Sequence, residues 1–313
     1  MCRIVFMGTP DFAVESLSLL LEEGFEIPLV VTQPDRPGNR KKMTPTPVKL
    51  LAEEKGLEII TPENVNDAKV VEKIKAQEPD FIVVVAFGQK IGREILDYIG
   101  ERIINVHSSI LPKYRGAAPI NWAIIEGEET SGATIMMIDE KLDRGDILHT
   151  VATRIGKDET APELEEKIKV LGAEGLVEVL RNFEKYYESR KSQKEEEASY
   201  RGYLTKSMGK IDWSETAEVI YNKYRGLKPW PGMFFVYNGE NIKVHKMNII
   251  KNYNESKEIG EVAEICKDHI TIAAAEGAVE IYELQFPGKK RMTVEQFLAG
   301  NTFPKGINLQ KEV

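Results

Sequence analysis

The chain has 313 residues, with 42 Lys and Arg against 50 Asp and Glu, so its formal net charge at pH 7 is −8. A hydrophobic content of 42% excludes a disordered or fibrous protein. The length predicts two domains, at about 150 residues per domain. An acidic total usually argues against a nucleic-acid partner, unless basic residues are concentrated locally.

The cysteines and histidines indicate neither a disulfide framework nor a metal site. Only Cys2 and Cys266 are present, which is typical of a reducing compartment. The histidines are isolated from one another in sequence, so no local zinc motif exists. The apolar run at residues 1–7 is too short for a signal peptide, and no run approaches the ~20 apolar residues of a membrane span. We therefore expect a soluble cytoplasmic protein without a metal.

The first half of the chain alternates predicted strands with predicted helices. Runs rich in branched apolar residues predict strands at Ile4–Met7, Pro28–Thr32, Phe81–Ala86 and Ile103–Val106. Helical spacing covers Phe12–Glu23, Pro47–Lys55 and Asn64–Gln77. This alternation predicts an α/β fold with a mostly parallel, open twisted sheet. In such a sheet, ligands bind beyond the carboxyl ends of the strands.

The pattern changes after residue 130. Two further strands are predicted at Ala133–Ile138 and Ile147–Arg154, and a long helix begins at the capping box of Thr160. The charged stretch Glu184–Ser199 is interpreted as a solvated helix end and a linker.

The last third of the chain predicts a different architecture. A helix at Ser214–Tyr224 is followed by short strands near 233–237, 242–249, 260–266, 269–274 and 278–285. This spacing predicts a small, partly closed β-barrel. We expect a first domain at 1–189, a linker at 190–205 and a C-terminal β-barrel domain at 206–313. Trp213 and Trp230 are interpreted as core or interdomain packing.

Three polar residues are candidates for catalysis. Asn105 and His107 lie two residues apart at the end of a predicted strand, so their side chains should point the same way. Asp143, in a glycine-containing loop, supplies a carboxylate. An isolated histidine is more often a structural residue, but the strand-end position and the two polar neighbours favour an active site.

The sequence around these residues resembles the folate-dependent formyltransferases. The resemblance is carried by Asn105–Pro112, Arg115–Pro119 and the Asp143 of LDRGDIL. It implies a Rossmann-like domain that moves a formyl group from 10-formyltetrahydrofolate to an amine, with Asn105, His107 and Asp143 as catalytic residues. Two departures are Ser-Ser-Ile-Leu-Pro at 108–112, where Ser-Leu-Leu-Pro is commoner, and Arg144, where a small residue is more usual.

Further motifs resemble the members of that family that formylate initiator methionyl-tRNA for translation initiation. They stand at Met7–Phe12, Thr32–Pro37, Ile211–Trp213 and Pro229–Gly232. The resemblance implies a tRNA partner, a C-terminal OB-like barrel that binds it, and a one-carbon transfer that needs no metal. We expect a monomer. The turn at Met7–Pro10 lacks the G-x-G-x-x-G spacing of a dinucleotide site.

Two loops resemble the family's folate-binding wall, in which backbone groups bind the pterin and apolar side chains contact it. The candidate residues are Phe87, Gly88, Gln89, Ser109, Ile110, Leu111 and Pro112. Ordinary loop packing is an equally good explanation for any single one of them.

Basic residues are concentrated at three places where the family contacts tRNA. Four stand in a Pro- and Gly-containing loop after the second strand, two at the entrance of the second domain and three at a turn within it: Arg36, Arg40, Lys41, Lys42; Lys206, Lys210; Lys289, Lys290 and Arg291. Solvated surface charge is the alternative, and phosphate contact is more plausible than base stacking in the loop. Residues 206–313 hold 15 Lys and Arg against 14 Asp and Glu, so the acidic excess lies in the rest of the chain.

Four other functions are weighed against this one. A formyltransferase for a sugar-nucleotide amine shares the catalytic residues but generally lacks the basic loop. A formyltetrahydrofolate hydrolase would use water as the acceptor. A non-catalytic RNA-binding module would not need Asn105, His107 and Asp143, and a dehydrogenase would need the missing glycine fingerprint.

Overall fold

The computed structural model describes residues 2–37, 43–253 and 257–311. The chain forms two compact units, and each is described by itself. The first unit comprises Met1–Pro119, Thr130–Arg154 and Glu163–Arg201, and the second comprises Ile120–Glu129, Ile155–Pro162 and Gly202–Val313. The expected limits of 1–189, 190–205 and 206–313 stay a prediction.

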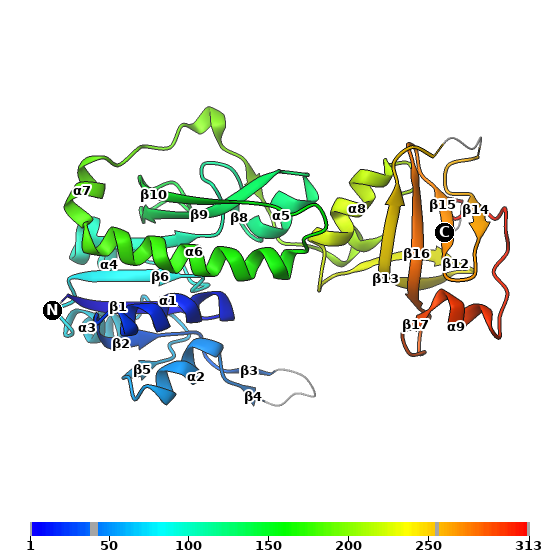
Figure 1. The fold of residues 1–313 in the computed structure, drawn as a ribbon. Helices are drawn as coiled ribbons and strands as arrows, with labels where there is room; N and C mark the ends of the chain where they lie inside the picture. Colours follow the sequence, from blue (N-terminus) through cyan, green and yellow to red (C-terminus); the bar gives the residue numbers. More distant parts are fainter. Residues whose placement is uncertain (1, 38–42, 254–256, 312–313) are drawn as a thin grey trace. The chain divides into compact units, whose positions relative to one another are not determined.

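A seven-stranded sheet forms the centre of the first unit (Figure 1). Its order is β10-β9-β7-β6-β1-β2-β5. The strands from β7 to β5 are parallel, and β9 runs antiparallel to both of its neighbours, β7 and β10. The strands are β1 (Arg3–Gly8), β2 (Glu26–Val31), β5 (Ile59–Ile60), β6 (Phe81–Val85), β7 (Ile103–His107), β9 (Thr130–Met137) and β10 (Ile147–Arg154). The predicted α/β fold with a mostly parallel sheet is confirmed.

Helices and short pairs of strands connect and cover this sheet. The helices are α1 (Asp11–Glu22), α2 (Pro47–Glu54), α3 (Ala68–Lys75), α4 (Arg93–Ile99), α6 (Ala161–Arg181) and α7 (Phe183–Glu188), with 3-10 turns η2 (Gly100–Arg102) and η3 (Glu195–Glu197). The short pairs are β3 (Arg36–Pro37) with β4 (Met43–Thr44), and β8 (Arg115–Gly116) with β11 (Tyr200–Arg201).

The helix α3 begins four residues later than the predicted start at Asn64. The side chain of Asn64 accepts a hydrogen bond from the backbone N–H of Asn66 and donates one to the Asp67 carboxylate, both at 3.0 Å. Such local bonds favour a turn over a helix. Apolar spacing alone does not reveal this competition.

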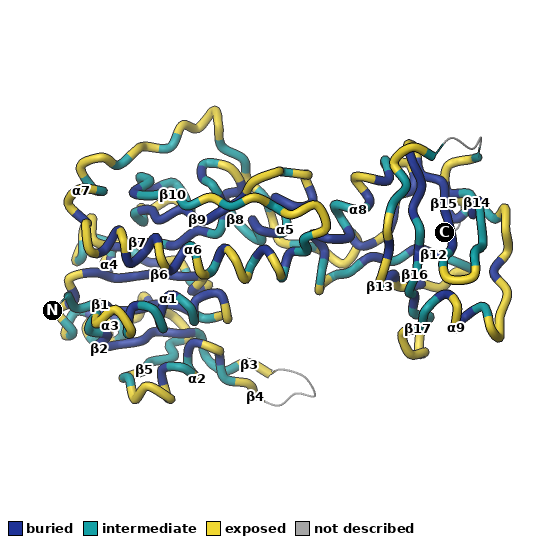
Figure 2. Tube along the Cα trace, viewed as in Figure 1, coloured by how far each residue is buried: buried dark blue, intermediate teal, exposed yellow. Residues whose placement is uncertain are grey.

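The helix α6 lies against the face of the sheet opposite the candidate site. A Cβ atom on Gly172 would stand 2.9 Å from the Cγ1 atom of Val106 and 3.3 Å from the Cβ of Ala133, so a glycine is needed for this close approach. Because side chains alternate along a strand, Asn105 and His107 point to the other face, away from α6. Figure 2 shows β1, β6 and β7 buried along most of their length.

The second unit has an antiparallel sheet of order β12-β13-β16-β15-β14, with β17 paired to β16. Its strands are β12 (Met233–Tyr237), β13 (Glu240–Ile250), β14 (Val262–Ile265), β15 (Ile270–Ala273), β16 (Ala278–Gln285) and β17 (Met292–Thr293). Its helices are α5 (Pro119–Ile125), η4 (Lys206–Gly209), α8 (Ala217–Gly226) and α9 (Val294–Leu298). Within the described residues no ladder joins β12 to β14, so the sheet stays open at that seam.

The two singled-out tryptophans differ in burial. Trp213 is 1% exposed and packs among the buried residues of the second unit's core, beside Phe235. Trp230 is 55% exposed, so the expectation that it fills a core is wrong. Trp230 lies in a turn between two prolines, and its ring lines a groove on the surface of this unit. None of the helices in the described ranges is long and apolar enough to cross a membrane.

Candidate active site

Asn105 and His107 project from the carboxyl-terminal half of β7. This strand lies between β6 and β9, with Asn105 paired to Val84 and His107 paired to Thr134. His107 is 7% exposed and Asn105 is half-buried. Among the described residues, none makes a hydrogen bond to the Asn105 side chain, so its amide N–H groups are available to a ligand.

The surroundings of the His107 ring define the role of each ring nitrogen. Its Nε2 atom lies 3.1 Å from the carbonyl oxygen of Tyr114. Because a carbonyl oxygen only accepts, Nε2 carries a proton in this bond. Nδ1 is left to take up or release a proton, and it stands 3.8 Å from Oδ1 of Asp143. The carboxylate is therefore placed to attract the imidazolium that forms when Nδ1 is protonated.

Asp143 is held in place by the backbone of a second loop. Its Oδ2 atom accepts a hydrogen bond of 2.8 Å from the backbone N–H of Gly116. Gly116 has a φ of 98°, and a Cβ atom there would stand 2.5 Å from the carbonyl oxygen of Arg201. Only glycine fits between these two neighbours. Asp143 itself has a φ of 55°, in the left-handed region.

The loop after β7 carries four of the expected folate-contacting residues. Thr134 on β9 holds this loop, because its hydroxyl donates to the Ser109 carbonyl at 2.7 Å and accepts from the Leu111 N–H at 3.1 Å. The Ser109 hydroxyl donates to the Lys113 carbonyl at 2.7 Å. Ser109 and Leu111 are buried, while Ile110 and Pro112, which complete the four, are half-buried.

The loop after β6 carries the other three, and it is tied to two neighbouring loops. The carbonyl of Phe87 accepts hydrogen bonds from the Thr9 hydroxyl at 2.8 Å and the Gln33 side chain at 3.2 Å. Gly88 is exposed, with a φ of 86°. The side chain of Gln89 is engaged at both ends, donating to the Pro62 carbonyl and accepting from the Val65 N–H. Sequence analysis missed Thr9 and Gln33, although both stand in motifs that it quotes.

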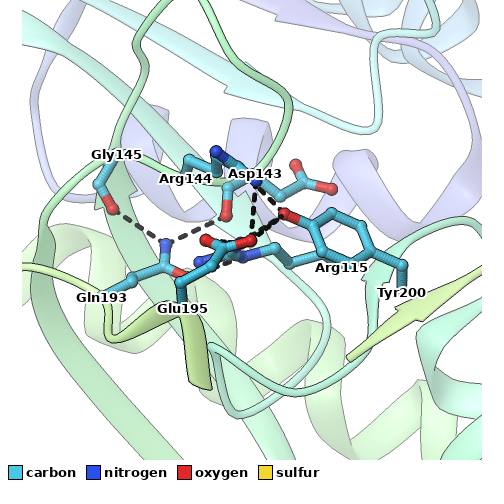
Figure 3. Close-up of polar contacts among 7 residues, drawn as sticks. All are labelled: Arg115, Asp143, Arg144, Gly145, Gln193, Glu195 and Tyr200. Carbon is cyan, nitrogen blue, oxygen red and sulfur yellow. Dashed lines mark hydrogen bonds and ion pairs between the residues drawn. The ribbon is translucent and has the colours of Figure 1, made fainter. Parts of the chain in front are cut away.

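A polar network joins the Asp143 loop to residues 193–200 (Figure 3). Gln193 donates to the carbonyls of Asp143 and Gly145, both at 2.9 Å. Glu195 pairs with the guanidinium groups of Arg115 and Arg144 at 2.9 and 2.7 Å. Arg144, one of the two departures from the family's pattern, thus pairs with Glu195.

The ion pairs perturb the titration of Glu195. The hydrogen bond from Arg115 lowers the pKa of the Glu195 carboxyl, partial burial opposes it, and Tyr200 and the Arg144 charge add to the lowering. Glu195 is exposed, as expected for the stretch 184–199, but Gln193 and Glu195 also make contacts that a solvated helix end and linker do not predict. Charge content alone gives no signal for these contacts, because their partners lie far away in sequence.

The expected tRNA-contacting residues are dispersed over the chain. Arg36 is exposed and forms an ion pair with Glu63 at 3.3 Å, whereas Arg40, Lys41 and Lys42 lie outside the described residues. Lys206, Lys210, Lys289, Lys290 and Arg291 are exposed on the second unit. Of these, Arg291 pairs with Glu283. Within the described ranges, no group of three or more His, Cys, Asp or Glu side chains could hold a metal ion.

The first unit thus brings an amide donor, an imidazole and a carboxylate to one edge of a parallel sheet. A fixed amide N–H stabilises negative charge on a carbonyl oxygen, and an imidazole transfers protons near neutral pH. These are the groups needed by an enzyme that transfers an acyl-type group to an amine.

The comparisons with known proteins identify the family. Residues 2–180 match the formyl transferase family, and residues 203–302 match the formyl transferase C-terminal domain. The chain belongs to the formyl transferase family.

Relatives match the chain over nearly its whole length. It is 47% identical to the methionyl-tRNA formyltransferase of Finegoldia magna, over 98% of this chain and 99% of the relative. It is 44% identical to the methionyl-tRNA formyltransferase of Clostridioides difficile, with the same coverage. Among solved structures, the N-formyltransferase of Helicobacter canadensis, in complex with folinic acid and dTDP-3-aminofucose, superposes with a TM-score of 0.65 at 18% identity, over 90% of this chain and 99% of that one. At this identity the superposition supports the fold alone.

Proposed function

We propose that this chain transfers the formyl group of 10-formyltetrahydrofolate to the free α-amino group of initiator methionyl-tRNA, in the cytoplasm. The full-length similarity to methionyl-tRNA formyltransferases at 47% and 44% identity supports this acceptor. The observation that carries the chemistry is the placement of Asn105 and His107 on one face of β7, with Asp143 3.8 Å from the imidazole.

In the proposed mechanism, Asn105 stabilises charge that develops on the formyl oxygen. The amine attacks the formyl carbon, so negative charge moves to that oxygen before the bond to the folate nitrogen breaks. The Asn105 amide has no hydrogen bond to another described residue, so it is free to donate to the oxygen. A fixed donor of this kind typically accounts for a factor of ~10²–10³ in rate.

His107 moves the proton in this mechanism. Its Nδ1 atom accepts a proton lost by the attacking amine, while Nε2 stays bonded to the Tyr114 carbonyl. The departing folate nitrogen must gain a proton, and the same imidazole supplies it. Between the two proton transfers, the Asp143 carboxylate stabilises the positive charge of the His107 imidazolium.

The folate wall is proposed from the two loops that border these residues. Phe87, Gly88 and Gln89 follow β6, and Ser109, Ile110, Leu111 and Pro112 follow β7. Because β6 and β7 are adjacent and parallel, both loops leave the same edge of the sheet. For Gln89 the proposed contact is through the backbone, since its side chain already has two partners.

A basic groove on the second unit supports the proposed tRNA contact. It has a volume of about 740 Å³, and no Asp or Glu is found among the described residues that line it. Its cationic lining residues are Lys206, Lys228, Lys243 and Arg291, the last of which pairs with Glu283, and its aromatic ones include Trp230 and Phe286. Cations bind phosphates and exposed aromatic rings stack on bases. We propose that residues 206–313, with Lys210, Lys289 and Lys290 near this groove in sequence, form the tRNA-binding domain.

The salt dependence of tRNA binding tests this groove. Replacing Lys206 and Lys243 together with Ala should weaken binding and reduce the slope of log affinity against log salt by ~0.7–0.9 per lost phosphate contact. Lys305→Ala, an exposed cation of the same unit outside the groove, is the control. An unchanged slope and affinity in the double variant would remove the groove from the proposal.

One assay tests the activity itself. The protein is incubated with 10-formyltetrahydrofolate and, in parallel, methionylated initiator tRNA, a UDP-amino sugar, or no acceptor. Formylmethionyl-tRNA is the expected product. Formylation of the sugar alone would indicate a sugar-nucleotide formyltransferase, and release of formate alone would indicate a hydrolase.

A further inference from the structure

Residues 193–200 contact two stretches of backbone, the one around Arg115 and the Asp143 loop. These two stretches position the catalytic imidazole and carboxylate. Ser199 accepts hydrogen bonds from the backbone N–H groups of Tyr114 and Arg115, and the side chains of Gln193, Glu195 and Tyr200 contact the Asp143 loop and Arg115 in Figure 3. None of these three side chains has a part in the proposed chemistry. Their effect on the reaction must therefore be indirect.

Gln193 acts on the main chain of Asp143. Its amide nitrogen donates to the carbonyl oxygens of Asp143 and Gly145, at 2.9 Å each, which uses both of its N–H groups. Asp143 has a φ of 55°, a backbone conformation that is costly for a residue other than glycine. The two hydrogen bonds stabilise this conformation, which directs the carboxylate toward His107.

Arg115 stands in the sequence between two residues whose backbone groups bind the catalytic side chains. The residue before it, Tyr114, supplies the carbonyl that binds Nε2 of His107. The residue after it, Gly116, supplies the N–H that binds the Asp143 carboxylate. A displacement of Arg115 would therefore change the positions of both catalytic groups.

Glu195 fixes the side chain of Arg115. One carboxylate oxygen of Glu195 accepts from Arg115 at 2.9 Å, and the other accepts from Arg144 at 2.7 Å. Arg115 is only 1% exposed, and a buried guanidinium without an anion is strongly unfavourable. The Tyr200 hydroxyl completes the arrangement by accepting from Arg144 at 2.8 Å. Glu195 thus joins the Arg115 stretch to the Asp143 loop.

We infer that Glu195 and Gln193 are positioning residues for formyl transfer, which set the Asp143 carboxylate against the imidazole of His107. This inference rests on the proposed function. It gives residues 193–200 a part in setting the geometry of the active site. All of the contacts involved lie within the first unit.

Two single variants test the inference by separating kcat from KM. Glu195→Gln and Gln193→Ala should each lower kcat about tenfold, because small displacements of a catalytic group are costly in rate. The KM values for folate and tRNA should stay within about twofold, since neither residue is placed in a binding surface. Both side chains lie at least partly open to solvent, so we expect folded variants, checked by circular dichroism.

The matched control is Glu196→Gln. Glu196 stands in the same 3-10 turn as Glu195 and is exposed, and its carboxylate has no ion-pair partner among the described residues. The same substitution there should leave kcat unchanged. An equal loss in this control would attribute the effect to the turn as a whole and overturn the inference.

A double-mutant cycle then tests whether Glu195 acts through Asp143. In an Asp143→Ala background, Glu195→Gln should lower kcat by clearly less than tenfold, because one of the two groups that it positions is gone. A full tenfold additional loss in that background would overturn the inference, as would wild-type kcat in both single variants. If the wild type formylates a different acceptor, the proposed function fails, and the cycle is measured on that acceptor with the same expected result.

Discussion

The strand β7 and the 193–200 segment act on the same site, but they are fixed by different forces. Asn105 and His107 belong to a strand with ladders to β6 and β9 on its two sides, and their direction follows from the register of the sheet. Gln193 and Glu195 are held by side-chain hydrogen bonds and ion pairs with Arg115 and the Asp143 loop, at least 48 positions away.

The difference separates two kinds of contribution to catalysis. The strand supplies the groups that meet the reacting atoms, so their loss removes a chemical function. The segment supplies only geometry, so its loss should leave the chemistry intact but less well aligned. The effects of substitution should therefore fall in a definite order, with the strand residues first.

The largest effect is expected at His107. His107→Ala removes the group that transfers the proton, and kcat should fall by ~10²–10⁴. Binding of tRNA, measured by filter retention, should be unchanged. His149→Ala, which removes a half-exposed histidine from β10 of the same unit, serves as the control. If kcat of His107→Ala stays within about threefold of wild type, the proton-transfer role is wrong.

Asn105→Ala should have the next largest effect. Loss of the amide donor should lower kcat by ~10²–10³, with the KM for folate little changed, because the donor acts mainly on charge that develops during the reaction. Asn105→Asp keeps the size of the side chain but replaces its N–H donors with a second acceptor. A nearly normal kcat in this isosteric variant would show that no donor is needed.

The sequence predicts most of the features that place Asn105 and His107 together at the end of β7. The continuous apolar run of β6 indicates a strand covered on both faces, and alternation then puts Asn105 and His107 on one face of β7. Both rules depend only on neighbouring residues, so a single sequence is enough to apply them. The catalytic roles of the residues came from the resemblance of their motifs to a family.

The 193–200 segment could not be predicted in this way. A stretch with several charges and few apolar residues has no periodicity, so solvent exposure is the ordinary interpretation. Arg115 is 1% exposed and forms its ion pair with Glu195, which lies 80 positions away in the sequence. Such a long-range ion pair leaves no trace in local spacing. The exposure of Trp230 was missed for a similar reason, because aromatic content alone does not tell a core from a groove.

A substitution at Gly116 tests the connection between the two regions. In Gly116→Ala the new Cβ would stand 2.5 Å from the Arg201 carbonyl and occupy a φ of 98°, so the β8–β11 pair must shift. We expect about 1–3 kcal/mol of destabilisation from the strained backbone and roughly a tenfold loss of kcat from displaced Asp143. The control is Gly202→Ala, where a Cβ has open space. Normal kcat in a destabilised Gly116→Ala would show that the pairing serves stability only.

The smallest effect is expected from the titration of Glu195, and it tests whether the segment is held by charge. The hydrogen bond from Arg115 lowers the pKa of Glu195 in the folded protein. A lowered carboxyl pKa contributes stability that is present above the unfolded-state value, about 4.3, and is lost as the pH falls through the folded value. The urea midpoint of wild type should thus exceed that of Glu195→Gln at pH 7, and the two should converge as the pH falls through the lowered pKa of Glu195. A difference that stays constant from pH 7 to the acid limit would mean that Glu195 supports the segment by packing rather than by its charge.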